Sequence, residues 1–246
     1  MQWVIPKAQL DTLLRQYGSP QVEYKKRREY CQKIRAIGKE LNLSSKISAL
    51  SQIIFMRYFL YNSLNSCDPL YVLSASIFLS MKLEDCRTKG IDELKKCCCD
   101  QFKEIKRIEE SELLLYERKV LVGINFELNI ETPHLYLNKL TNGFSIETNL
   151  KLDAWAFTND LCCTHVVLTH TPFCIALLSL CFSSKQHKFD LSYDCDMIRS
   201  QCQKLSLKCP EETLSRTGKI HLLEFFAIKA EYVQEAMSAL TQFYNP

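Results

Sequence analysis

Two short stretches of this sequence place charged residues directly against long apolar runs. Residues 77–85 read Ile-Phe-Leu-Ser-Met-Lys-Leu-Glu-Asp, so Lys82, Glu84 and Asp85 end an almost entirely apolar segment. Residues 116–128 set Glu117 in a similar apolar frame. Charged side chains rarely lie against a core without a partner. Lys82 and Glu117 can therefore pair with each other, or be offered together to the backbone of another protein. Composition alone favours the salt bridge within the chain.

Other patterns that could support chemistry are weak. The 13 cysteines include contiguous runs at 97–99 and 162–163, whereas a structural zinc site needs paired Cys-x-x-Cys or His-x-x-x-His ligands. The six glycines are too far apart for a phosphate-binding loop. No Gly-x-Ser-x-Gly elbow marks a nucleophile. We therefore expect reduced and mostly buried thiols, no metal, no cofactor and no catalytic residue.

Charge and hydropathy indicate an ordinary globular chain with a net charge of +3. Four consecutive cations at residues 25–28 could contact phosphate, but Glu23 and Glu29 flank them, and a solvated helix face is the simpler interpretation. We expect no direct nucleic-acid partner. The N-terminus does not resemble a signal peptide, and His170 and Pro172 interrupt the most apolar segment. We therefore expect a soluble, intracellular protein without a membrane partner.

Helices must position the charged residues, because only 6 glycines and 7 prolines occur in 246 residues. Apolar spacing predicts helices at residues 24–41, 47–59, 70–83, 91–102 and 109–124. Ser44 or Ser45 can cap the second of these, and Asp68 with Pro69 can begin the third. The fifth is expected to bury a stripe made of Leu113, Leu114, Val120, Leu121 and Ile124.

An extended linker over residues 125–133 separates this set from a second one. Five more helices are expected at residues 135–140, 148–168, 172–184, 195–205 and 219–244. The predicted fold class is all-α, with two tandem five-helix domains. We place an N-terminal segment at residues 1–23, a first domain at 24–130, and a second domain with a C-terminal helix at 131–246.

The two charged stretches resemble the cyclin-box signature of the cyclin family. Residues 77–85 are similar to its block Phe-Leu-Ala-Ser-Lys-x-Glu-Glu, and residues 117–128 with Pro133 resemble the continuation of the box at the family's spacing. Residues 38–43 and 53–59 resemble the first two box helices. Residues 155–160 and 171–177 resemble the second repeat of the transcription-type cyclins C, H, K, T and L. Both five-helix domains are then cyclin-box-like.

The resemblance implies a regulatory subunit, not itself an enzyme, that binds and activates a cyclin-dependent protein kinase as a heterodimer. In that family the third to fifth box helices hold the αC helix of the kinase. Carried over residue by residue, Lys82 and Glu117 hydrogen-bond the kinase backbone. The other residues of the expected kinase-binding site are Leu79, Leu83, Glu84, Leu121 and Leu128. The resemblance also implies a role in transcription regulation, through phosphorylation of the RNA polymerase II C-terminal domain. The location that it implies for the protein is the nucleus, with the cytoplasm as a second location.

This chain departs from the cell-cycle members of the family at two places. Their apolar Met-Arg-Ala-Ile-Leu block would fall on residues 26–30, which read Lys-Arg-Arg-Glu-Tyr, and the accompanying Trp would fall on Lys33. We therefore expect no apolar substrate docking there. Arg57-Tyr58 replaces the usual Asp-Arg or His-Arg, which puts the customary ion pair of the second box helix in doubt.

A second hypothesis is a transcription-factor core of the IIB type, which has the same double fold and acts as a DNA and protein adaptor. Such a core needs a strongly basic second repeat. Residues 135–246 are not markedly basic, because five aspartates lie among their lysines, namely Asp153, Asp160, Asp190, Asp194 and Asp196.

Overall fold

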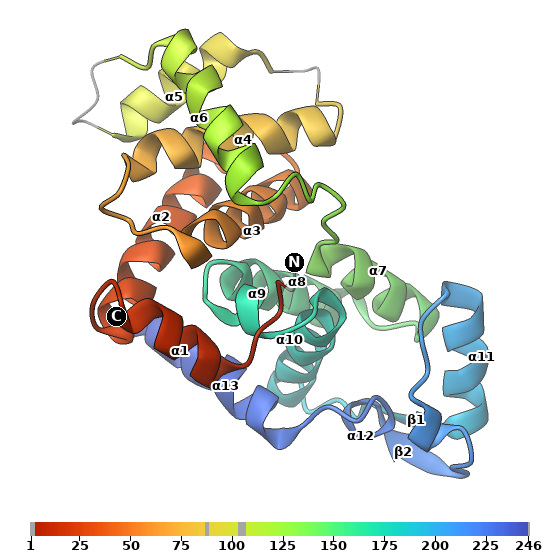
Figure 1. The fold of residues 1–246 in the computed structure, drawn as a ribbon. Coiled ribbons are helices and arrows are strands. Elements are labelled where there is room, and N and C mark those ends of the chain that lie inside the picture. The colour runs from red at the N-terminus through yellow and green to blue at the C-terminus, as the bar shows by residue number, and fades with distance from the viewer. Residues whose placement is uncertain (1–2, 87–88, 103–106, 246) are drawn as a thin grey trace. The chain divides into compact units, whose positions relative to one another are not determined.

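A computed structural model describes residues 3–86, 89–102 and 107–245 of the protein. Within these ranges the chain is helical nearly throughout, which confirms the predicted all-α class (Figure 1). It divides into two compact units. One contains the residues up to Thr132 together with Cys162–Thr169, and the other contains Pro133–Leu161 and His170–Asn245.

The first unit is built around two apolar helices. Its helices are α1 (Lys7–Arg15), α2 (Pro20–Glu40), α3 (Ser45–Tyr61), α4 (Pro69–Leu83), α5 (Ile91–Gln101), α6 (Glu110–Gly123) and the short α9 (Val166–Thr169). Helices α3 and α4 are buried on most sides, as their sequences predict, and α3 packs against α2, α4 and α6.

Both central helices begin at a cap that the sequence predicts. The Ser44 hydroxyl accepts a hydrogen bond from the backbone N–H of Ile47 over 3.2 Å. The Asp68 carboxylate accepts one from the N–H of Leu70 over 2.9 Å, directly before the Pro69 that opens α4. These caps fix where α4 starts, and its fifteen residues then fix where Lys82 lies in the last turn.

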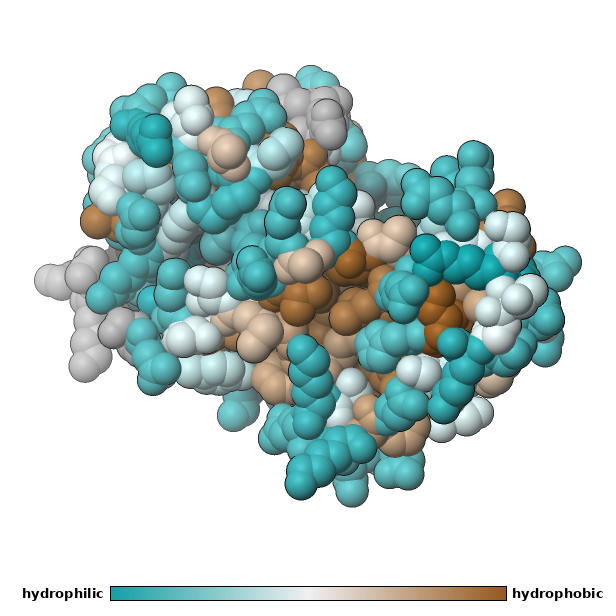
Figure 2. Space-filling model, turned by 90° about the horizontal axis from the view of Figure 1, so that it is seen from below, coloured by the Kyte–Doolittle hydropathy of each residue, from teal (hydrophilic) through white to brown (hydrophobic). Residues whose placement is uncertain are grey.

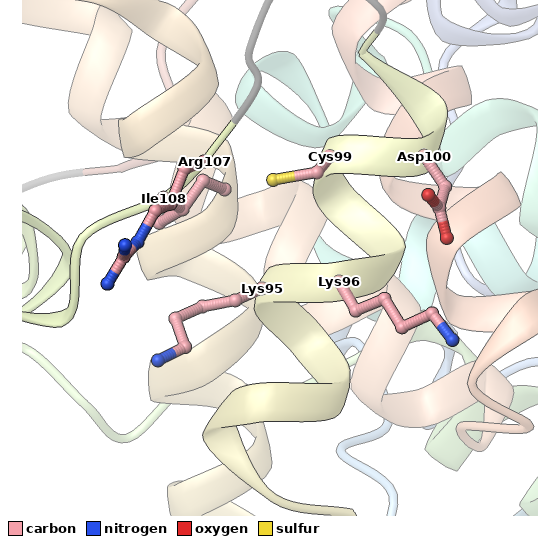
Figure 3. Close-up of a pocket in the computed structure, with 6 residues that line it drawn as sticks. All are labelled: Lys95, Lys96, Cys99, Asp100, Arg107 and Ile108. Carbon is pink, nitrogen blue, oxygen red and sulfur yellow. The ribbon is translucent and has the colours of Figure 1, made fainter.

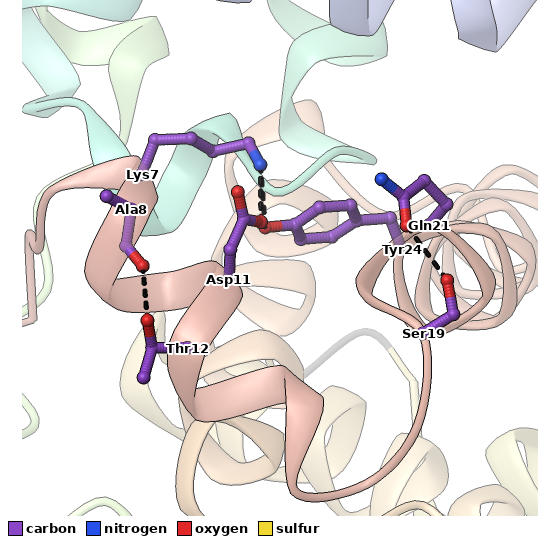
Figure 4. A network of polar contacts seen from close by, with 7 residues as sticks. All are labelled: Lys7, Ala8, Asp11, Thr12, Ser19, Gln21 and Tyr24. Carbon is purple, nitrogen blue, oxygen red and sulfur yellow. Dashed lines mark hydrogen bonds and ion pairs between the residues drawn. The ribbon is translucent and has the colours of Figure 1, made fainter.

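Helix α1 falls in the segment that was predicted only as an N-terminal extension. It is held to α2 by a polar cluster in which the Tyr24 hydroxyl donates to Asp11, and Lys7 Nζ lies 2.5 Å from the same carboxylate (Figure 4). Ahead of α1, Trp3 and Ile5 are buried, and the Ile5 N–H donates to the carbonyl of Leu168 over 2.9 Å. This segment is therefore part of the first unit's packing.

The second unit packs α7 (Pro133–Gly143) against α10 (Pro172–Gln186) around a core of leucines, isoleucines and phenylalanines. Its other elements are α8 (Thr148–Cys162), β1 (Ser192–Asp194), α11 (Cys195–Leu205), a 3₁₀ turn (Glu211–Thr213), β2 (Lys219–His221), α12 (Leu222–Phe225) and α13 (Ala230–Tyr244). Helix α11 has the bounds that the sequence predicts.

Two predicted helices of this part of the chain are wrong in their extent. The helix expected over 148–168 ends at Cys162, and Val166 begins the separate turn α9 with its N–H donated to the Thr164 hydroxyl over 3.3 Å. The helix expected over 219–244 instead begins as β2, which pairs antiparallel with β1 through Ser192 opposite His221. Strands of three residues are too short to show an alternating pattern of apolar and polar residues. The sequence pattern alone therefore predicts a helix at β2.

The basic run of α2 also differs from its prediction as a solvated face. Lys25 and Lys26 are exposed, but Arg27 is only 1% exposed and Arg28 is buried as well. The Arg27 guanidinium lies 3.2 Å from the carboxylate of Glu23, one turn earlier and also buried. Burial lowers the pKa of Arg27. The Arg27–Glu23 ion pair is buried within α2, so only Lys25 and Lys26 of the basic run lie on the solvated face that the sequence predicts.

None of the described helices is long and apolar enough to cross a membrane. Figure 2 shows that hydrophilic residues cover most of the face seen from below, while hydrophobic residues gather in a smaller area of that face.

Candidate functional site

Lys82 and Glu117 meet in the structure. Helices α4 and α6 pack side by side, which brings the last turn of α4 against the middle of α6. Lys82 Nζ lies 2.8 Å from Oε1 and 2.9 Å from Oε2 of Glu117, so it donates to both carboxylate oxygens. The two residues that the sequence singled out therefore form one salt bridge in the isolated chain.

The two partners of this bridge differ in their freedom to move. The Glu117 side chain is 10% exposed, whereas the Lys82 side chain is 48% exposed. The Lys82 ammonium also lies 4.2 Å from the centre of the Phe78 ring, one turn earlier on α4. A buried carboxylate needs a donor at all times, while an exposed lysine can rotate into water at little cost. The carboxylate is therefore the fixed part of the site and the ammonium is the movable part.

The apolar residues predicted around this pair lie at different depths. Leu79 is buried inside the first unit, so its side chain packs in the core and is not available to a partner. Leu83, Leu121 and Leu128 are half-buried and present part of their side chains to solvent. Glu84, the other charged residue of the predicted site, lies 2.5 Å from Lys46 Nζ of α3. Its carboxylate is thus already occupied by a neighbour within the same unit.

The predicted buried stripe of α6 is partly wrong. Leu113, Val120 and Ile124 are buried, but Leu114 is exposed and Leu121 is only half-buried. The helix buries Tyr116 and Glu117 instead, because it turns its tyrosine toward α4, where the Tyr116 ring stacks on Tyr71 with centroids 5.0 Å apart. The exposed leucines add apolar surface beside the salt bridge.

Close packing of α6 against α3 depends on Gly123. A Cβ atom at this position would lie 2.5 Å from Cδ2 of the Tyr58 ring. No real side chain reaches that distance, so only glycine lets the last turn of α6 approach α3 this closely. The position of Glu117 on α6 depends on this approach.

Phe126 is a candidate site residue that sequence reasoning did not select. It lies three residues after the end of α6, its φ is +54°, and the residue is 63% exposed. Asn125 before it also has a positive φ, and the Phe126 N–H donates to the carbonyl of Leu121 over 2.8 Å. A bulky residue in the left-handed region is uncommon, and such strain tends to occur at functional sites. The sequence gives no direct signal here, because a left-handed residue after a helix is usually a glycine and this one is a phenylalanine.

Arg57, the second departure from the family pattern, belongs to a cluster at the N-terminal segment. Its guanidinium lies 5.1 Å from the centre of the Trp3 ring, and Trp3 Nε1 donates to Glu127 over 2.6 Å. Burial lowers the pKa of Arg57 to about 10, although the Glu127 carboxylate partly offsets this effect. The cluster fastens Trp3 to the segment that follows α6.

A cleft of about 330 Å³ lies on α5 and the segment before α6 (Figure 3). The sulfur of Cys99 points toward Arg107 and Ile108, whereas Lys96 and Asp100 point away from them. Lys95 lies 2.7 Å from Asp92, and Arg107 lies 2.9 Å from Glu109. Because neighbouring acids already neutralise these two cations, the cleft does not have the character of an anion site.

The cysteines do not form a metal-binding centre among the described residues. Nine of the thirteen are buried, as predicted, and none forms a disulfide. Burial raises the pKa of Cys98, Cys174 and Cys181 to about 12, which keeps these thiols protonated at neutral pH. In the described ranges, no group of three or more His, Cys, Asp or Glu side chains could hold a metal ion.

Comparison with known proteins shows the family and the fold of this chain. Residues 7–129 match the family model described as the cyclin N-terminal domain. The chain belongs to the cyclin family. This cyclin is 29% identical to human cyclin-K over 181 residues, which cover 70% of the chain and 31% of cyclin-K. It is 24% identical to cyclin-C of Drosophila melanogaster over 182 residues, which cover 68% of each protein. It thus spans about a third of the length of human cyclin-K.

Solved structures show the same fold. The yeast RNA Pol II CTD kinase CTDK-1 complex contains a chain that matches with a TM-score of 0.67 and 15% identity, covering 76% of this cyclin and 64% of that chain. A chain of the yeast TFIIK (Kin28/Ccl1/Tfb3) complex matches with a TM-score of 0.60 and 20% identity, covering 83% and 95%. These likenesses establish the cyclin fold for this protein.

Proposed function

We propose that this cyclin binds and activates a cyclin-dependent protein kinase as its regulatory subunit. The observation that carries the proposal is the Lys82–Glu117 bridge, which sets a buried carboxylate and a movable ammonium within an apolar surface. The residues 24–130 would form the kinase-binding box and the residues 131–246 the second repeat.

Binding would exchange the partners of the bridge. Glu117 can accept a hydrogen bond from a backbone N–H of the kinase αC helix, and Lys82, once it rotates outward, can donate to a backbone carbonyl there. The exchange keeps the buried carboxylate satisfied in both states. A partner helix placed out of register would leave it without a donor, at a cost of about 1–3 kcal/mol. The pair therefore sets the register of the bound helix.

The surrounding apolar side chains would supply the affinity. The partly exposed apolar residues of this region lie on α4, on α6 and just after α6, and they are Phe78, Leu114, Leu121 and Leu128. Phe126, also just after α6, is exposed over most of its surface. Burying such surface stabilises a complex by about 25 cal/mol per Å² before the entropy of association is subtracted. Holding the αC helix in this way would place its Glu against the catalytic Lys of the kinase.

The relatives support a role in transcription. The names of the similar curated proteins include cyclin-K and cyclin-C, and one similar structure is described as an RNA Pol II CTD kinase complex. We therefore propose phosphorylation of the RNA polymerase II C-terminal domain as the activity of the bound kinase, and the nucleus as its location.

Co-purification with a panel of cyclin-dependent kinases tests the proposal. The double substitution Lys82→Ala with Glu117→Ala should leave the protein folded, because it leaves no unpaired buried charge, and should reduce kinase recovery at least about tenfold. Lys219→Ala with Asp190→Ala removes an ion pair of 3.1 Å on the second unit and serves as the matched control. The proposal would be refuted if the Lys82→Ala, Glu117→Ala variant recovered as much kinase as the control variant does.

A further inference from the structure

The second unit carries a preformed apolar pocket that the kinase proposal does not use. It lies between α8, α10 and α13, has a volume of about 340 Å³, and is lined chiefly by Phe157, Phe182, Lys185, Met237, Leu240 and Tyr244. A cavity of this size is in the range of pockets that accept small ligands or anchoring side chains. All of its lining residues belong to the second unit.

The pocket has a buried floor and an exposed apolar rim. Phe182 and Leu240 are buried, while Met237 is 48% exposed and Tyr244 is 54% exposed. Met237, Leu240 and Tyr244 recur at spacings of three and four residues, so they share one face of α13. Met237 and Tyr244 expose apolar surface two helical turns apart, with the buried Leu240 between them, and this spread suits an extended or helical peptide better than a compact metabolite. Methionine is common at such surfaces because its side chain adapts to the ligand.

One contact holds the rim in place. The Tyr244 hydroxyl donates to the carboxylate of Asp160 on α8 over 2.5 Å, and Asp160 is buried. This bond fixes the end of α13 against α8, and it occupies the Asp160 carboxylate. The pocket is therefore present before any ligand arrives, which lowers the entropy cost of binding.

The charge at the pocket mouth is positive. Lys185 is exposed in the last turn of α10, and no acidic residue in the described ranges forms an ion pair with it. An apolar pocket with one unneutralised ammonium at its rim is complementary to an apolar group that carries a nearby carboxylate.

We propose that this pocket docks an acidic amphipathic peptide segment of a partner protein. Two apolar side chains of the peptide would fill the space above Phe182 and Leu240, and an Asp or Glu beside them would contact Lys185. The proposal rests on the second unit alone, so it stands or falls independently of kinase binding.

Methionine-methyl NMR on the whole chain tests the proposal. The probe is an acetylated, amidated 12-residue peptide in which Leu and Phe recur at three- and four-residue spacing and Asp fills the other positions. Met237 reports on the pocket, and Met197, exposed on α11, reports on non-specific binding. Two further peptides carry Lys in place of every Asp, or Ser in place of every Leu and Phe. Met237→Leu assigns the signal.

We expect the acidic peptide to shift the Met237 methyl signal in a saturable way while the Met197 signal stays in place. Lys185→Glu should weaken this binding about fivefold or more, and Lys188→Glu, an equal charge change three residues away, should not. The proposal is overturned if the Met237 signal does not saturate by 1 mM peptide, on the order of the weakest specific affinities. It is overturned equally if Met197 moves in parallel, if either control peptide binds as tightly, or if the two charge reversals act alike.

Discussion

Replacing Phe126 with Ala and, separately, with Gly should divide the role of its ring from that of its backbone. Both substitutions remove the exposed ring that we place in the kinase contact. Only Gly also relieves the left-handed backbone, whose φ is +54° at this residue. The two variants should therefore bind a kinase equally weakly and differ in stability.

The size of each effect follows from exposure and backbone conformation. Full burial of a Phe side chain is worth about 1.5–3 kcal/mol, and this one is 63% exposed, so losing the ring costs the free chain about 1 kcal/mol. The left-handed conformation costs a residue other than Gly about 1–2 kcal/mol, and the greater unfolded-state entropy of Gly offsets about 0.5–1 kcal/mol of the relief. The Gly variant should thus be more stable than the Ala variant by about 0.5–1 kcal/mol.

Urea unfolding of the free chain and calorimetric titration with the kinase measure the two effects. Ser206 provides the matched control, because its φ is +52° at the exposed end of α11 in the second unit. Ser206→Gly should exceed Ser206→Ala in stability by a similar amount, with unchanged kinase affinity. For Phe126, both variants should bind at least about fivefold more weakly than the parent chain.

Either of two results would contradict the reasoning. If the Gly variant retains the parent affinity, the ring does not contact the kinase. If the Ala and Gly variants unfold at the same urea concentration while the Ser206 pair differs, the backbone at Phe126 is not strained.

Two further predictions concern the packing that supports the site. Gly123→Ala should destabilise the chain by about 1–3 kcal/mol in urea unfolding, because the new Cβ would lie 2.5 Å from the Tyr58 ring. Gly143→Ala is the control and should destabilise the chain less, because its Cβ would lie 2.4 Å from the flexible end of the Leu205 side chain. An equal loss of stability in the two variants would contradict this prediction. Burial lowers the pKa of His134 from 6.5 to about 4, so the folded state favours the neutral ring and stability should fall by up to about 3 kcal/mol as the pH drops from 6.5 toward 4. His134→Gln should flatten this part of the pH profile in urea unfolding, and an unchanged slope would show that another group causes it.

The elements that carry the salt bridge could be predicted because local signals agree with their packing. Ser44 and Asp68 each combine a capping side chain with an apolar run directly after it, and both cap their helix in the structure. The charged residues Lys82 and Glu117 stood out in the sequence because each lies in an apolar frame. Their meeting at 2.8 Å follows once α4 and α6 pack side by side.

Other features depend on contacts that a single sequence does not display. Arg27 looks solvated within a run of four cations, and only the fold shows that Glu23 accompanies it into the interior. Phe126 occupies a left-handed position that usually selects glycine, so its residue type gives no warning of its conformation. The short strand ending at His221 exists only because a strand 25 or more residues earlier pairs with it, and pairing at that distance leaves no local pattern.

The assignment of Cys162–Thr169 to the first unit has a practical consequence for dissecting this cyclin. A fragment that stops at Thr132 would lose eight residues of its own interior, among them the Cys163 sulfur that accepts from Gln52 and the Leu168 carbonyl that accepts from Ile5. Such a fragment should expose apolar surface that is buried in the whole chain, and it should therefore aggregate when it is expressed alone. Supplying the missing octapeptide in trans should rescue its solubility, as in fragment complementation.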